Sequence, residues 1–259
     1  MKSKIGVAAV TGFLATALFA TLASAQCNPA PNYPGVMIKF DGDAWAYETA
    51  YTTATFTSAP GSQLTVVGRV SVFCSPFADL DPADPNTDYT FIWDGLNSLG
   101  TASKTVGSSG MQYTTKYLGG SFRIYAGSPR NAPTAATLPA LPAPGVVPDA
   151  FVDGTMILSG GMDTLTVIVT RGSTGSYTGS FRADYRGTGG TLYTRVGDAI
   201  NLMSGLWCAA PPNNPNPPYP IGTCQQPVGW SAHPNGKWDT PATVPAMPST
   251  WGKIKTLYR

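Results

Sequence analysis

The clearest pattern along the chain is a two-residue alternation of apolar and polar positions over residues 165–186. In residues 165–170 (LTVIVT) every second residue is Leu or Val, and in residues 177–186 (YTGSFRADYR) every second residue is aromatic or small. The remaining positions of the second run are all polar. A strand with one face on a core and the other in water has this period. The Gly- and Ser-rich residues 171–176 between the runs predict a β-hairpin.

Further short runs rich in β-branched and aromatic residues predict other strands. They cover residues 36–40, 47–57, 63–73, 88–93, 113–125 (a hairpin around Gly119-Gly120), 192–196, 199–207 and 251–258. Turn signals lie at Asp41-Gly42-Asp43, Pro60-Gly61, Asp94-Gly95 and Asn235-Gly236. No stretch has a helical period. About ten strands predict an all-β chain, an antiparallel β-sandwich of immunoglobulin-like, fibronectin-like or jelly-roll type. The chain resembles these folds in fold class only, and no motif identifies a family.

Residues 128–148 interrupt the alternation, because they are rich in Pro and Ala and have no period. They are interpreted as a long crossover within one domain that spans residues 26–259. An interdomain linker is the alternative. One domain is preferred because all-β domains of this length are common.

The first 25 residues have the form of a secretory signal peptide. Lys2 and Lys4 precede an apolar stretch, and Ala23-Ser24-Ala25 is a small-residue cleavage site. The polar residues that follow favour export over membrane anchoring, so we expect a secreted or cell-surface protein without an integral membrane anchor.

Charge excludes one class of partner. Removal of the signal takes away two of the 16 Lys and Arg residues, which leaves as many basic residues as the 14 Asp and Glu. Nucleic-acid binding needs concentrated Lys and Arg, and the sequence has no such stripe. We therefore expect no nucleic-acid partner.

The four cysteines predict two disulfides, because an exported chain with an even number usually pairs them. The expected pairs are Cys27–Cys74 and Cys208–Cys224. A zinc site is disfavoured, since there is no CxxC spacing and only one histidine, His233.

An acidic loop, FADLDPADPNTDY, is the candidate metal site. It offers the oxygen ligands of Asp79, Asp81, Asp84, Asn86 and Asp88, and calcium prefers several oxygens from one flexible loop. The loop departs from the EF-hand pattern, and Asp and Asn also begin turns without a metal. Calcium is thus a possible ligand, and no other cofactor is predicted.

Catalytic patterns are weak. Asp41, Asp43 and Glu48 form a second acidic group, from which a glycosidase would need two carboxylates. Glu48, the only glutamate, is expected to be a solvated strand residue. His233 is expected in an exposed loop, dispensable for the fold, and no Gly-x-Ser-x-Gly sequence marks a nucleophile.

Aromatic residues give the remaining signal, because the chain has 6 Trp and 12 Tyr. Trp45, Trp230 and Trp238 lie in turn-rich segments and are the candidates for surface rings. Trp230 and Trp238, together with Arg182 and Arg186 on the polar face of the central hairpin, are the candidates for a surface that stacks on sugars. For any single tryptophan, packing is preferred over contact with a ligand.

These patterns predict an exported, non-catalytic β-sandwich protein with a binding or structural role outside the cell. Its expected partner is a polysaccharide, an envelope component or another copy of the chain. The alternative hypothesis is a secreted carbohydrate-active enzyme that uses paired aspartates.

Overall fold

A computed structural model of the chain describes residues 27, 35–52, 55–134, 137–139, 146–172, 177–197, 200–209 and 229–239. The predicted signal peptide, Cys224 and the predicted strand over residues 251–258 lie outside these residues.

The described residues form strands and two short 3₁₀ helices. The strands are β1 (Val36–Phe40), β2 (Ala44–Glu48), β3 (Tyr51–Thr52), β4 (Thr57–Ser58), β5 (Gln63–Arg69), β6 (Val72–Phe73), β7 (Asp88–Val106), β8 (Gly110–Leu118), β9 (Ser121–Gly127), β10 (Thr155–Arg171), β11 (Tyr177–Gly189), β12 (Ile200–Cys208) and β13 (His233–Asp239). The 3₁₀ helices are η1 (Asp149–Phe151) and η2 (Tyr193–Arg195).

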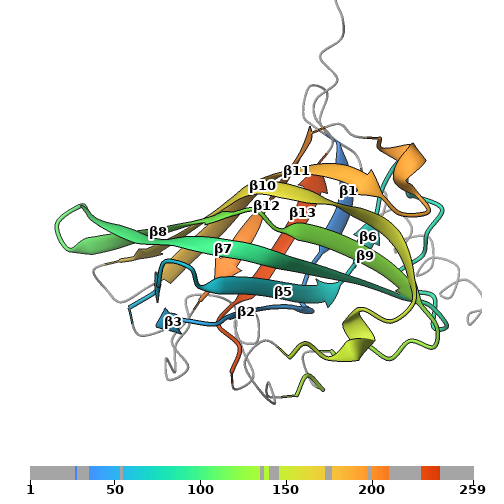
Figure 1. Cartoon of the computed structure of the whole chain (residues 1–259), viewed down its shortest axis with the longest axis horizontal. Helices are drawn as coiled ribbons and strands as arrows, with labels where there is room; N and C mark the ends of the chain where they lie inside the picture. The colour runs from blue at the N-terminus through green and yellow to red at the C-terminus, as the bar shows by residue number, and fades with distance from the viewer. Residues whose placement is uncertain are drawn as a thin grey trace, which may run out of the picture.

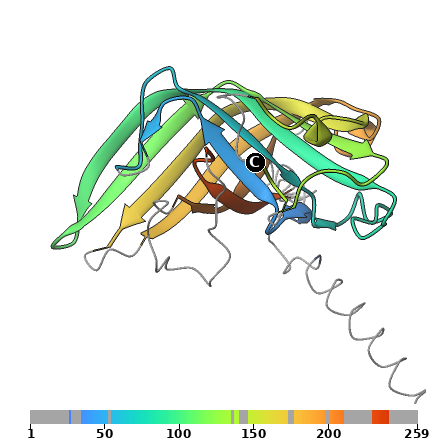
Figure 2. The same cartoon turned by 90° about the horizontal axis from the view of Figure 1, so that it is seen from below.

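Every described strand except β3 and β4 belongs to one sheet, with the order β2-β5-β7-β8-β10-β11-β12-β13-β1-β6. β9 pairs with both β7 and β10, and β3 and β4 form a separate two-stranded sheet. All the pairings between these strands are antiparallel, which confirms the predicted all-β class. The large sheet is strongly curved, so that its two halves face each other in a sandwich-like arrangement (Figures 1 and 2).

Ring contacts between strands far apart in the sheet order show how the halves meet. The ring of Phe40 on β1 lies 4.8 Å from that of Phe91 on β7, between centroids. The curvature also brings the β2 edge back to the chain just before β13. There, the Ala46 N–H donates to the Ala232 carbonyl at 2.8 Å, and the Ser231 N–H donates to the Ala46 carbonyl at 2.7 Å. Backbone groups at the β2 edge thus find partners within the same chain.

The predicted central hairpin is confirmed. β10 and β11 pair with Val167 opposite Phe181, in the middle of the sheet. Phe181 and Tyr185 are buried, and the alternate positions of β11 are exposed. One face of the hairpin therefore covers the core and the other meets water, as the alternation predicts.

The predicted hairpin around Gly119-Gly120 is wrong. β8 and β9 do not pair with each other but lie one after the other, each between β7 and β10. Both glycines have positive φ, 68° and 102°, so the chain is offset there without reversing. β7 correspondingly continues for 19 residues, through the expected turn at Asp94-Gly95.

Asn235-Gly236 is also not a turn, because both residues lie within β13. Gly236 pairs with Gly205 of β12. A Cβ on Gly236 would lie 2.6 Å from Cζ of Phe181 and 2.9 Å from Cζ of Phe40. The glycine therefore serves close packing of the core against the sheet, a role that sequence cannot distinguish from a turn signal.

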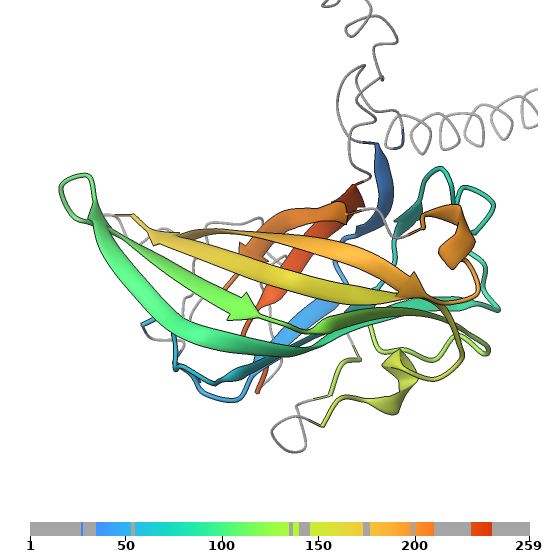
Figure 3. The ribbon, with the colours of Figure 1, turned by 45° about the horizontal axis from the view of Figure 1, so that its top comes forward.

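The described parts of the Pro/Ala-rich crossover cover the outer face of the sheet over β2, β5, β7 and β9. A second apolar cluster lies there, with Trp45, Val67 and Ile92 from the strands and Leu138 and Phe151 from the crossover and η1. Figure 3 shows η1 outside the strands, beside this part of the sheet. Proline cannot take part fully in a sheet ladder, but an extended segment can still bury apolar side chains on one.

The predicted Cys27–Cys74 disulfide is confirmed, with Cα atoms 5.3 Å apart. Its cysteines are 47 residues apart. The chain-entropy account assigns a loop of this length about 4 kcal/mol of stabilisation. Cys208 is also disulfide-bonded, but the predicted partner Cys224 lies outside the described residues, so that pair stays a prediction.

Candidate functional site

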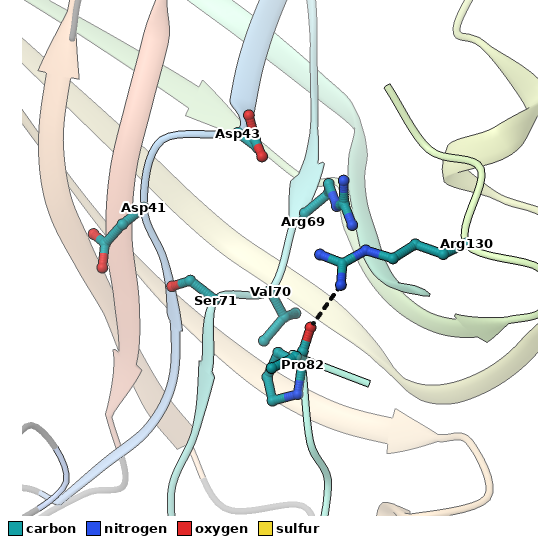
Figure 4. A pocket seen from close by; sticks show the side chains of 8 residues that line it. Asp41, Asp43, Arg69, Val70, Ser71, Pro82 and Arg130 are labelled. Carbon is teal, nitrogen blue, oxygen red and sulfur yellow. Dashed lines mark hydrogen bonds between the residues drawn. The ribbon is translucent and has the colours of Figure 1, made fainter. Parts of the chain in front are cut away.

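A cleft of about 360 Å³ lies where several connections between strands meet (Figure 4). Four segments that are distant in the sequence line it. They are the β1–β2 connection (Asp41 and Asp43), the end of β5 with the β5–β6 connection (Arg69, Val70 and Ser71), the acidic loop (Pro82 and Ala83) and the crossover (Arg130). Loops held by a rigid sheet are the usual place for binding residues.

Backbone hydrogen bonds hold the first two segments together. The N–H of Arg69 donates to the carbonyl of Asp43 at 2.8 Å, and the N–H of Ser71 donates to the carbonyl of Lys39 at 2.9 Å. Gly42 has a φ of 87°, which favours glycine, and its N–H donates to Oδ1 of Asn235 at 2.9 Å. This wall of the cleft is thus fixed by β5 and β13.

A buried ion pair lies behind the cleft. Nη2 of Arg69 is 2.9 Å from Oδ1 of Asp88, and their side chains are only 8% and 4% exposed. Oδ2 of Asp88 accepts the N–H of Ala132 at 2.8 Å. Since the desolvation of two charges is offset only by good geometry and further hydrogen bonds, the pair is sensitive to the loss of either partner.

Arg130 comes from the crossover and lies beside Arg69. Its Nη1 donates to the carbonyl of Pro82 at 3.3 Å, and its Nε is 3.8 Å from Oδ1 of Asp88. Its side chain is 36% exposed. Figure 4 shows the two arginines side by side, with Asp43 across from them and the Asp41 side chain turned away from them, toward β13.

This arrangement presents hydrogen-bond donors opposite acceptors. Guanidinium groups only donate, ionised carboxylates only accept, and the Ser71 hydroxyl does both. Each charge type is present, and the apolar Val70 and Pro82 lie between them. Such a cleft suits a neutral ligand with several hydroxyl groups, because a hydroxyl can satisfy donors and acceptors alike.

The five oxygen ligands predicted for calcium are not brought together. Two Arg195 nitrogens donate to Asp79, one of them at 2.9 Å, and this hydrogen bonding lowers the Asp79 pKa. Asp81 accepts the N–H of Ala83 at 2.9 Å, and Asp84 accepts that of Asn86 at 2.9 Å. The latter bond is the main reason why the Asp84 pKa is lowered.

Asp88, the last of the five, points instead to Arg69 behind the cleft. Among the residues that the structure describes, no group of three or more His, Cys, Asp or Glu is placed to hold a metal ion. The acidic side chains of this loop thus serve local turns and ion pairs, which matches the turn interpretation of Asp and Asn before Pro.

The expectation that Trp230 and Trp238 lie on the surface is wrong. Trp238 is fully buried, with its ring 5.0 Å from that of Phe40 and 5.3 Å from that of Phe91. Trp230 is 5% exposed, and its indole N–H donates to the carbonyl of Pro139 at 3.2 Å. Neither ring can form an exposed platform, because each belongs to one of the two apolar clusters.

His233 is likewise not an exposed loop residue. It begins β13, is 2% exposed, and its ring stacks on that of Trp45 with centroids 6.0 Å apart. Its Nε2 lies 3.0 Å from the carbonyl oxygen of Gly42. We therefore expect a structural contribution from His233, since replacement by alanine would leave a cavity.

Arg182 and Arg186 do lie on the exposed outer face of β11, as predicted. Arg182 is 3.9 Å from Asp184, and both side chains are more than half exposed. In the sheet register Arg182 lies opposite Ser204 of β12. Their role in ligand binding stays a prediction.

The expectation that Glu48 is solvated is wrong, because Glu48 lies in a buried polar cluster. Glu48 lies opposite Leu64 of β5, is 5% exposed, and accepts a hydrogen bond from the Tyr117 hydroxyl at 2.9 Å. The Ser58 hydroxyl on β4 also donates to it. Burial raises the pKa of Glu48. The sequence contained one usable signal, since an inward position follows from the alternation with Ala44 and Ala46, which are also buried.

Comparison with models of protein families, with curated proteins and with solved structures finds no match for the chain. Over the part of the chain that the structure describes, no helix is long and apolar enough to span a membrane.

Proposed function

We propose that the protein is exported and non-catalytic, and that it binds a saccharide in the cleft between Asp41, Asp43, Arg69 and Arg130. The observation that carries this proposal is an open cleft in which the partly exposed guanidinium of Arg130 lies across from Asp43, with Arg69 behind it and Asp41 also in the lining. Neighbouring sugar hydroxyls match both kinds of group. The Cys27–Cys74 disulfide fits an exported protein.

Arg130 is the residue on which binding depends most directly. Arg69 is committed to the buried Asp88, whereas Arg130 is partly exposed and forms only a long contact with that carboxylate. Its remaining N–H groups face the cleft (Figure 4). We expect hydrogen bonds from Arg130 to ligand oxygens to contribute more than those from Arg69.

The test is a binding screen of the mature protein against insoluble and soluble polysaccharides, followed by titration of the best ligand. Arg130→Met is expected to weaken binding about ten-fold or more, because a charge-assisted hydrogen bond contributes about 1.5–3 kcal/mol. Arg171→Met, an exposed arginine at the end of β10, is the matched control. Equal affinity of both variants and the parent protein would reject the cleft as the site.

The second candidate function is glycoside hydrolysis, and the observation in its favour is that Asp41 and Asp43 line the same cleft. Two carboxylates that flank a bond are the requirement of this chemistry. Release of soluble sugar in the screen, abolished in both Asp41→Asn and Asp43→Asn, would favour the enzyme. Binding without sugar release favours the proposal.

A further inference from the structure

A second depression adjoins the cleft. Its volume is about 250 Å³, and it lies on the outer face of β12, β13 and β1. Its lining residues are Lys39, Asp41, Ser204, Gly205, Leu206, Asn235, Gly236 and Lys237. Asp41 lines both depressions, so the two lie next to each other on either side of the β1–β2 connection.

The floor of this depression is the backbone of two paired glycines whose side-chain positions face the core. Gly205 lies directly opposite Gly236, and the core rings of Phe181 and Phe40 press against this pair from inside. Around the paired glycines, side chains from neighbouring positions form the rim. Leu206 is one of them and is 54% exposed, which is high for a leucine on a strand.

The charges of the combined groove cancel. Lys39 lies opposite Lys237 in the register, an arrangement that is unfavourable unless a carboxylate compensates it. Nζ of Lys237 is 3.0 Å from Oδ2 of the buried Asp239. The groove and its immediate ion-pair partners thus contain four basic residues, Lys39, Arg69, Arg130 and Lys237, and four acidic ones, Asp41, Asp43, Asp88 and Asp239.

We infer that the ligand is a linear, neutral polysaccharide that crosses Asp41 and occupies both depressions. This inference rests on the proposed saccharide binding in the cleft. A polyanion would meet Asp41 at the centre of the groove, and a polycation would meet the lysines at one end. A neutral chain meets donors and acceptors along its whole length, and its apolar ring faces can contact Leu206.

A groove with two adjoining subsites has a property that a single pocket lacks. Units of one chain that occupy both subsites bind with a high effective concentration, so affinity rises with chain length until the groove is filled. Charge cancellation adds a second property. Long-range attraction is absent, so binding should change little with ionic strength.

The experiment measures affinity for oligosaccharides of increasing length, from the disaccharide to the octasaccharide, by calorimetry at low and high salt. The probes are oligomers of cellulose, chitin, xylan, mannan and starch, and polygalacturonate is the acidic comparison. We expect affinity for one neutral series to rise about ten-fold or more with length, and to be nearly independent of salt.

Leu206→Ala separates the two subsites. It is expected to lower the affinity of long oligomers several-fold and to leave the disaccharide unaffected, whereas Arg130→Met should weaken both. Leu118→Ala is the matched control, because Leu118 is also exposed, at 44%, but lies on β8 and lines neither depression.

Two results distinguish failure of this inference from failure of the proposed function. Affinity independent of length, or unchanged by Leu206→Ala but lowered by Arg130→Met, would overturn the groove and leave saccharide binding in the cleft. Absence of binding to every polymer tested, polygalacturonate included, would overturn both. Preference for polygalacturonate with strong salt dependence would also reject a neutral ligand.

Discussion

Arg69 and Asp88 form an ion pair at 2.9 Å, and crossover residues complete it. The N–H of Ala132 donates to Asp88, and the carbonyl of Ala132 accepts from Arg69 at 3.5 Å. The pair thus joins β5, the start of β7 and the crossover that supplies Arg130. It connects the stability of this region to the geometry of the candidate site.

We therefore expect Asp88→Ala to lower the free energy of unfolding by about 3–5 kcal/mol, because it leaves the guanidinium of Arg69 buried without its partner. Urea denaturation measures the change. Asp163→Ala, at an exposed position of β10, is the control and should stay within about 0.5 kcal/mol of the parent protein. If Asp88→Ala lowers the free energy of unfolding no more than the control does, the ion pair does not stabilise the fold.

The pH dependence of stability should reveal Glu48. Burial raises its pKa above 4.5 in the folded protein, so the folded state binds the proton more tightly than the unfolded chain does. The contribution of Glu48 to stability is therefore greatest below pH 4.5 and falls as the pH rises towards the folded pKa. The groups that face its carboxylate are Ser58, Ser62, Tyr117 and Tyr51.

Burial also raises the pKa of Asp239, so the contribution of Asp239 to stability likewise falls as the pH rises. Glu48→Gln separates the two, because it removes one titration and leaves the other. The difference in unfolding free energy between Glu48→Gln and the parent protein should increase in favour of the variant as the pH rises. A difference that is constant with pH would contradict a raised pKa at Glu48.

Gly236→Ala should destabilise the fold by about 1–3 kcal/mol, since its Cβ would press on the rings of Phe181 and Phe40. Gly161→Ala on β10 is the matched control, because a Cβ there meets nothing within 4 Å. Thermal or urea unfolding compares the two. Similar stability of both variants would mean that the core can move away from β13 without loss.

Peptide mapping of the non-reduced protein is expected to link Cys208 to Cys224 and Cys27 to Cys74. Removal of the Cys208–Cys224 bond should lower the free energy of unfolding by about 3 kcal/mol. This is the value for a loop of about fifteen residues in the chain-entropy account. A peptide that links Cys27 or Cys74 to Cys208 would contradict this pairing.

The sequence by itself determined the central hairpin and one disulfide. A period of two in residues 165–186 is enough to predict the β10–β11 hairpin with its inner and outer faces, because side-chain direction in a strand depends only on position parity. The Cys27–Cys74 disulfide was predicted from the exported character of the chain and from its position beside a strand.

Tertiary structure decided everything that depends on which strands meet. The same Gly-containing dipeptides that predict turns lie inside β7 and β13, because the core packs against Gly236 and the β7 ladder continues past Gly95. The segment between Trp230 and Trp238 has the composition of a loop, and only tertiary contacts bury the two rings. Trp238 packs on Phe40 and Phe91 inside the curved sheet, and Trp230 packs on Trp45 of β2 and hydrogen-bonds to the crossover.

The candidate site depends on the same long-range contacts. Asp43, Pro82 and Arg130 belong to three separate connections and Arg69 ends β5, and no spacing in the sequence relates them. Sequence determines which residues alternate along a strand, since that follows from the geometry of one backbone. The register of pairing and the meeting of connections follow from burial of the whole apolar interior, which is a property of the complete sheet.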